Sequence, residues 1–261
     1  MSIYVGIGGW IYEPWRDNFY PARLPQKREL EYASSKLTAI EVNGTYYGSQ
    51  KPESFRKWRA ETPDGFVFAL KGPRFATNRR VLAEAGDSIA RFVDSGITEL
   101  KDKLGPINWQ FMATKKFDPQ DFAAFLALLP RSVGGRALRH AVEVRHDSFR
   151  DEAFVKMCRD RDVAIVCGAD ADFPVIADVS AGFVYVRAMG TSAKEKLGYA
   201  PGDIRKWAAR AKAWEKGDGP KDLALVAKPA AKKPRDVFLF VISGAKEKNP
   251  AAAQAIIAAL D

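Results

Sequence analysis

Two short aliphatic runs of the sequence each carry a glutamate followed, two positions later, by a second polar residue. The first run contains Glu41 and Asn43, and the second contains Glu143 and Arg145. Because side chains alternate between the two faces of a strand, each pair shares a face opposite its aliphatic neighbours. A carboxylate placed beside a bound substrate can act as a general acid or base. We therefore take Glu41 and Glu143 as candidate catalytic residues.

Further polar side chains stand at the ends of other aliphatic runs. Lys71 and Arg187 end two of them in the same phase, Gln110 ends a third, and Asp170 follows a fourth. In a barrel of parallel strands all these ends meet at one mouth, which is where such folds bind their ligands. Aromatic residues follow the first two runs. The candidate ligand-binding residues are Trp10, Tyr12, Asn43, Tyr46, Lys71, Arg74, Gln110, Arg145, His146, Asp170 and Arg187.

A basic stretch begins at the end of one run and includes Lys71, Arg74, Arg79 and Arg80. Guanidinium groups match the geometry of phosphate and carboxylate oxygens, so this stretch could hold an anion. A solvated basic loop is the alternative interpretation, because runs of charge usually face solvent. The carboxylates could also simply neutralise the cations, which would make the charged mouth purely structural.

The histidines and cysteines of the sequence do not favour a metal site or a cysteine-based reaction. His140 and His146 are the only histidines, and a site of His146 with Glu41, Glu143 and Asp170 would use fewer histidines than most zinc sites. Cys158 and Cys167 form no second pair, which indicates reduced thiols in a cytoplasmic protein. We expect no metal and no cofactor. No apolar run reaches the ~18 residues of a membrane span, so we expect no membrane partner.

The elements that must position these residues alternate between strand and helix. Amphipathic helical stretches open at Pro52, Asp87, Asp118-Pro119 and Asn249-Pro250. Strand–helix alternation predicts parallel strands, and eight units in 261 residues match an α/β fold with one closed (β/α)8 TIM-like barrel domain over residues 1–261. An open doubly wound sheet would need a glycine-rich phosphate turn that is missing. The expected strands are 3–8, 38–43, 66–71, 106–111, 141–145, 163–168, 182–187 and 237–242, and an exposed basic loop is expected around 216–234.

The net charge of +9, from 41 basic and 32 acidic residues, favours an acidic partner or ligand. An apolar content of 47% excludes a disordered chain. Two classes of partner fit the charge. One is a small anionic or phosphate-bearing ligand, and the other is a nucleic acid whose bases would stack on exposed aromatic rings.

Several motifs occur in a fixed order along the chain: GGWIY (8–12), EVNGTYY (41–47), TPDGF (62–66), FALKGPR (68–74), EVRH (143–146) and YVR (185–187). Together they closely resemble the YecE-like proteins, domain-of-unknown-function family 72. The resemblance covers about residues 3–190 and implies a TIM-like barrel, but no settled activity. The chain departs from the family pattern at Asn78 and Met189, where the family tends to carry histidine.

The resulting functional hypothesis is a barrel that binds a phosphate-bearing or other anionic ligand at its C-terminal mouth. Acid–base chemistry of the hydrolase or lyase type would use Glu41 or Glu143. The alternatives are a nucleic-acid-binding protein without catalysis and a barrel whose charged mouth is only structural. The residues leave the substrate and the oligomeric state open.

Overall fold

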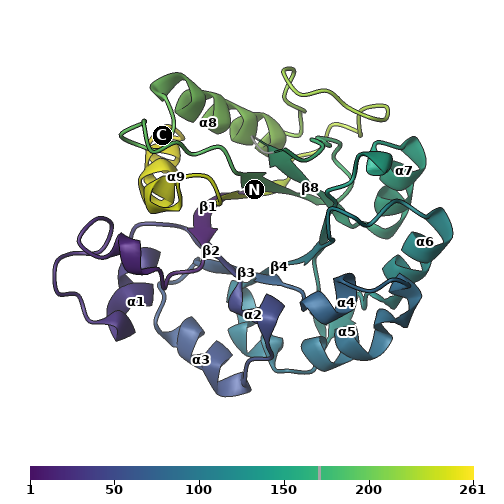
Figure 1. Cartoon of the computed structure of the whole chain (residues 1–261), viewed down its shortest axis with the longest axis horizontal. Helices are drawn as coiled ribbons and strands as arrows, with labels where there is room; N and C mark the ends of the chain where they lie inside the picture. Colours follow the sequence, from purple (N-terminus) through teal and green to yellow (C-terminus); the bar gives the residue numbers. More distant parts are fainter. Residues whose placement is uncertain (170–171) are drawn as a thin grey trace.

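A closed barrel forms the centre of the molecule in the computed structural model (Figure 1). Within residues 1–169 and 172–261, which the structure describes, eight parallel strands follow one another around the barrel in the order β1-β10-β9-β8-β7-β4-β3-β2. The predicted TIM-like barrel is confirmed, with most strand ends displaced by one or two residues. The strands are β1 (Ile3–Gly8), β2 (Ala39–Val42), β3 (Val67–Lys71), β4 (Leu104–Gln110), β7 (His140–Glu143), β8 (Ala164–Ala169), β9 (Phe183–Ala188) and β10 (Asp236–Val241).

Helices surround the barrel and cover the outer face of the strands (Figure 1). Asp118 begins one of them as its sequence predicts, because its carboxylate accepts hydrogen bonds from the backbone N–H groups of Gln120 and Asp121. Prolines at the first turn begin others. The α-helices are α1 (Glu29–Ser34), α2 (Gly44–Tyr47), α3 (Pro52–Ala60), α4 (Arg74–Thr77), α5 (Gly86–Val93), α6 (Pro119–Leu128), α7 (Glu152–Arg161), α8 (Pro201–Glu215) and α9 (Asn249–Ala258). The 3-10 helices are η1 (Glu13–Trp15), η2 (Gln26–Arg28), η3 (Leu82–Ala85), η4 (Ile97–Lys103), η5 (Asp147–Phe149) and η6 (Lys246–Lys248).

One local expectation from the sequence is wrong, and one element of the structure was not expected. The amphipathic stretch that opens at Asp87, with apolar residues on one face as far as Leu104, predicts one helix. In the structure α5 ends at Val93 and η4 begins after Gly96, whose φ of 98° no right-handed helix accommodates. A short hairpin of β5 (Ser132–Val133) and β6 (Arg136–Ala137) was not expected. Its turn residues Gly134 and Gly135 have φ values of 53° and 76°, as a tight hairpin turn requires.

The connection between β8 and β9 differs from the other crossovers, because its described residues form no helix. The basic loop 216–234 is fastened to this connection. The carboxylate of Asp178 accepts hydrogen bonds from the backbone N–H groups of Val226, at 2.7 Å, and Ala227, at 2.9 Å. Leu223 and Val226 pack against the core, while most lysines of the loop are exposed. The loop therefore exposes its lysines but is anchored near its middle.

Side chains pointing into the barrel change from apolar to charged along the strands. Large rings from β9 and β10 and small alanines from the opposite strands fill the lower layers, where Phe183 and Phe238 meet Ala39, Ala69 and Ala141. The inward positions nearest the carboxyl ends are charged on β2, β3, β7 and β9, whereas β10 stays apolar at Phe240. The alternation that places alanine inside thus also places the charged side chains inside, one layer nearer the mouth.

Candidate functional site

A buried ion-pair network occupies the barrel interior near the carboxyl ends of the strands. Arg187 on β9 lies at its centre and contacts a glutamate on each side. Its Nη1 donates to Glu143 Oε1 and Oε2 at 2.8 and 2.7 Å, and its Nη2 donates to Glu41 Oε1 at 3.0 Å. Glu41 is fully buried, and Glu143 and Arg187 are 2% and 5% exposed. The predicted convergence of Glu41, Glu143 and Arg187 at one end is therefore present in the structure.

Two further residues join this network, and the candidate residues named from the sequence did not include them. Tyr185 donates from its hydroxyl to Glu41 Oε2 at 2.6 Å. Asn108 donates from Nδ2 to Glu143 Oε2 at 3.2 Å and lies 3.5 Å from Glu41 Oε2. Each precedes a candidate residue on the same strand by two positions, so strict period-two reading of β4 and β9 would have found both.

Arg145 adds a second guanidinium to Glu143. Its Nε and Nη2 atoms donate to Glu143 Oε1 at 2.9 and 2.7 Å, and its guanidinium carbon lies 4.5 Å from the centre of the Phe173 ring. Every oxygen of the two glutamates thus accepts at least one hydrogen bond. Replacing one charged residue of such a buried network leaves the charge of its partner uncompensated. The contributions of these residues to stability therefore depend on one another.

Lys71 at the end of β3 belongs to the same layer but has a different kind of partner. Its Nζ donates to Gln110 Oε1 and lies 4.7 Å from the centre of the Tyr46 ring. Among the described residues, no carboxylate lies within 4 Å of Nζ, although Lys71 is only 4% exposed. Lys71 is therefore a buried cation with uncharged contacts.

The pKa directions follow from these contacts. Burial lowers the pKa of Lys71 to about 8, Arg187 acts in the same direction, and Glu41 and Glu143 oppose both. Burial alone would raise the pKa of Glu143, but the charges of Arg187, Arg145 and Lys71 outweigh it and lower that pKa to about 2. Glu143 is consequently ionised throughout the physiological range, whereas Lys71 titrates near its upper end.

Other candidate residues lie around the network without joining it. Arg74 is exposed, with its guanidinium over the rings of Tyr47 and Phe75. Arg79 turns toward Ser88, to whose hydroxyl it donates at 3.2 Å. The basic stretch after β3 therefore does not close over the strand cations. His146 makes a local contact instead, in which its Nδ1 accepts from the backbone N–H of Ser148 at the start of η5. Asp170 lies outside the described residues.

Both cysteines lie in the interior of the protein, and the described part of the chain contains no cluster of metal ligands. Cys158 and Cys167 are buried and not joined in a disulfide. Burial raises the pKa of the Cys158 thiol. No group of three or more His, Cys, Asp or Glu side chains is arranged to hold a metal ion among the described residues. None of the described helices has the length and apolar character needed to cross a bilayer.

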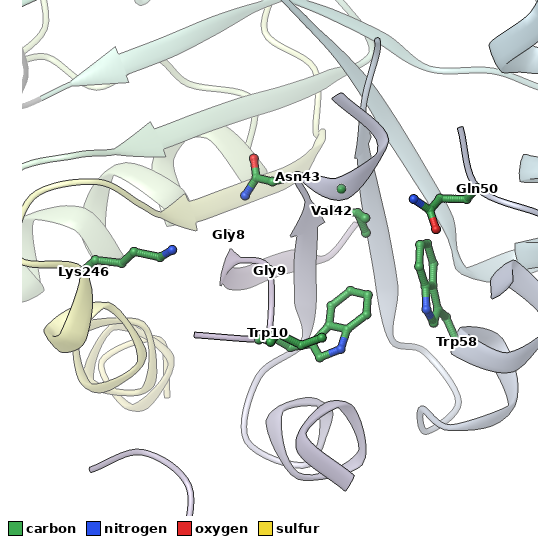
Figure 2. A pocket seen from close by; sticks show the side chains of 10 residues that line it. Gly8, Gly9, Trp10, Val42, Asn43, Gln50, Trp58 and Lys246 are labelled. Atoms are coloured by element: carbon green, nitrogen blue, oxygen red, sulfur yellow. The ribbon is translucent and has the colours of Figure 1, made fainter. Parts of the chain in front are cut away.

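A cleft of about 310 Å³ opens beside the network, at the carboxyl ends of β1 and β2 (Figure 2). The expected aromatic residue Trp10 and the expected amide Asn43 line it. Tyr12 stands next to it, with its ring 3.9 Å from Nζ of Lys246, a lining residue that the sequence did not single out. Lys246 follows β10, at the far end of the chain from Tyr12, so only barrel closure brings the two together.

Comparison with known proteins places this geometry in a family. The family model for "Protein of unknown function DUF72" matches residues 4–261. The UPF0759 protein YecE of Escherichia coli is 30% identical over 147 residues, which are 56% of this chain and 50% of that protein. The UPF0759 protein YunF of Bacillus subtilis is 32% identical over 69 residues, which are 26% of this chain and 23% of that protein. The matched part of the chain thus spans half or less of these curated relatives.

Solved structures agree with the fold along the whole chain. A DUF72 family protein from Thermotoga maritima has a TM-score of 0.72 at 20% identity, covering 98% of this chain and 97% of the other. A DUF72 family protein from Enterococcus faecalis has a TM-score of 0.71 at 16% identity, covering 99% and 97%. The identities are low, so these two likenesses establish the barrel rather than a reaction. With the family model matching almost every residue, the chain belongs to the DUF72 family of TIM-barrel proteins of unknown function.

Proposed function

We propose that the protein binds a small anionic ligand, such as a compound carrying a phosphate group, at the C-terminal mouth of the barrel. The observation that carries this proposal is the state of Lys71, a buried ammonium group whose nearest partners are an amide oxygen and an aromatic ring. A buried cation is costly unless a negative charge compensates it. A ligand anion would supply that charge.

The charge balance of the network supports an anion rather than a cation. Within the described part of the chain, Lys71, Arg145 and Arg187 face the two carboxylates Glu41 and Glu143, which leaves one positive charge in excess. Both carboxylates are occupied by the two arginines. The two carboxylates hold the guanidinium groups in place, so the ammonium group of Lys71 remains for the ligand.

The ring of Tyr46, which is half-buried and belongs to the four-residue helix α2, covers Nζ of Lys71. Displacing this ring, together with the Gln110 amide, would expose Nζ to an anion entering from the mouth. Charge-assisted hydrogen bonds of this kind contribute about 1.5–3 kcal/mol each, or roughly 10- to 150-fold in affinity.

Acid–base chemistry at this mouth would fall to Lys71 before the glutamates. A proton-transfer group works best when its pKa lies near the working pH, and the pKa of Lys71 is about 8. Glu143, with its pKa lowered to about 2, is a weak base in the free protein. Catalysis of the hydrolase or lyase type by Glu41 or Glu143 stays a prediction from the sequence.

Calorimetric titration with inorganic phosphate at pH 7 tests the proposal. Wild-type protein should show saturable binding, and Lys71→Met should weaken it at least tenfold. Lys116→Met is the matched control, because it makes the same substitution at an exposed lysine that is not part of the network. Binding should also weaken as the pH rises above 8, where Lys71 loses its proton. Phosphate binding that survives Lys71→Met unchanged, or no binding by the wild type, would leave a purely structural network as the better account.

A further inference from the structure

The cleft at the ends of β1 and β2 has aromatic walls and a bare backbone floor (Figure 2). The indole rings of Trp10 and Trp58 meet edge to face, with centroids 5.2 Å apart and an angle of 78° between their planes. Both are half-buried, so each keeps an accessible part. Gly9 has a φ of 75°, and apart from its two chain neighbours no described residue has an atom within 4 Å of the position that a Cβ would take. A flat molecule can therefore approach the backbone closely here.

Two amide side chains on the cleft wall have no hydrogen-bond partner among the residues that the structure describes. Asn43 and Gln50 both line the cleft, and neither makes a side-chain hydrogen bond with any residue that the structure describes. Asn43 stands at the start of α2 but does not cap it. An amide offers both donors and an acceptor, so the two side chains can pair with polar atoms on the edge of a ligand.

Lys246 supplies a positive charge to the cleft. It is the only ionisable residue among the described ones that line the cleft, and no carboxylate in the described part of the chain lies within 4 Å of its Nζ. Figure 2 shows its side chain reaching into the cleft from the side opposite Gln50 and Trp58. Its backbone is fixed, because Trp15 Nε1 donates to the Lys246 carbonyl at 2.9 Å. Its ammonium group is held 3.9 Å from the centre of the Tyr12 ring.

We propose that this cleft binds a small, flat heteroaromatic carboxylate. The ring would lie against Trp10 and Trp58, its edge atoms would pair with the two amides, and its carboxylate would contact Lys246. The volume of about 310 Å³ accommodates such a molecule and lies at the small end of the usual range for ligand pockets. This inference goes beyond the anion proposed for the mouth, because the cation that it uses is Lys246 and not Lys71.

Three probes separate the contributions of ring and charge. Nicotinate is a flat heteroaromatic carboxylate, nicotinamide keeps the ring without the charge, and cyclohexanecarboxylate keeps the charge without the flat ring. Calorimetric titration of the wild type should give nicotinate an affinity at least tenfold higher than either of the other two. The binding free energy from stacking on aromatic side chains and that from a charge-assisted hydrogen bond are each large enough to produce this ratio of affinities.

Variants then locate the bound molecule. Lys246→Met should weaken nicotinate at least tenfold and leave nicotinamide unchanged, whereas Trp58→Leu should weaken both. Lys248→Met is the matched control, because it removes the same charge from the same 3-10 helix but does not line the cleft. Phosphate titration of Lys246→Met keeps the two proposals apart, since that variant should bind phosphate at the mouth as the wild type does.

Several results would overturn the inference. They are equal affinities for the three probes, no saturable binding of nicotinate, and nicotinate binding that Lys246→Met leaves intact. Nicotinate binding that is lost in Lys71→Met but retained in Lys246→Met would likewise refute it, and would place the carboxylate at the mouth.

Discussion

Replacing Lys71 by methionine should stabilise the protein at neutral pH, although it removes the charge at the proposed anion site. Methionine is close to lysine in length and packs well in apolar surroundings. The substitution keeps most of the packing at the end of β3 and removes a desolvated charge. We expect the variant to unfold at a higher urea concentration than the wild type at pH 7.

The size of the effect follows from the pKa of Lys71. Its pKa falls from the ordinary 10.5 to about 8 on folding, so the unfolded chain binds more protons than the folded protein between these values. The resulting destabilisation is fully present below pH 8 and disappears as the pH rises through 10.5. By linkage it amounts to about 3 kcal/mol at pH 7 and to about 1 kcal/mol at pH 10. The gain from Lys71→Met should therefore be about 2 kcal/mol larger at pH 7 than at pH 10.

Urea unfolding followed by tryptophan fluorescence measures this difference directly. The quantity to compare at the two pH values is the difference in unfolding free energy between Lys71→Met and the wild type. Any change in packing that does not depend on pH cancels in this comparison. Lys116→Met, which removes an exposed lysine, serves as the control and should show nearly the same stability as the wild type at both pH values. An equal effect of Lys71→Met at pH 7 and pH 10 would refute the reasoning, and so would a variant that is relatively less stable at pH 7.

Three further outcomes are expected. Glu143→Gln should lower the free energy of unfolding at pH 7 by about 3 kcal/mol or more, because it leaves Arg187 short of a buried counter-charge. Since the pKa of Glu143 is lowered to about 2, this loss of stability should shrink as the pH falls from 4.5 toward 2. A loss that stays constant over this pH range would contradict the pairing. Gly6→Ala should abolish folding or lower the thermal midpoint sharply, because its Cβ would lie 1.9 Å from the backbone oxygen of Ala39, and a variant with wild-type melting would be inconsistent with this register of β1 and β2. Cys158 should resist a thiol reagent in the native protein and react after unfolding, because burial raises its pKa, and rapid labelling of the native protein would show that the site opens.

Much of the barrel was predictable because it rests on local regularities. The alternation of aliphatic and polar residues in short runs fixes which face of each strand points inward, and so Glu41, Glu143 and Arg187 were expected at one end. Helix starts such as Asp118-Pro119 depend on neighbouring residues alone. The break at Gly96 was missed because a periodic stripe does not show where a positive φ interrupts it.

The residues by themselves thus determined the fold, the phase of each strand and the collection of charges at the mouth. Only the tertiary structure decided how those charges pair, because Arg187 and Glu41 are 146 positions apart and meet solely through closure of the barrel. Closure pairs Arg187 with both glutamates and leaves Nζ of Lys71 in contact with an amide oxygen and an aromatic ring. It also carries Lys246 to Tyr12 and the cleft. Pairing between distant side chains depends on register, rotamer and burial in three dimensions, and no spacing along the chain encodes these quantities.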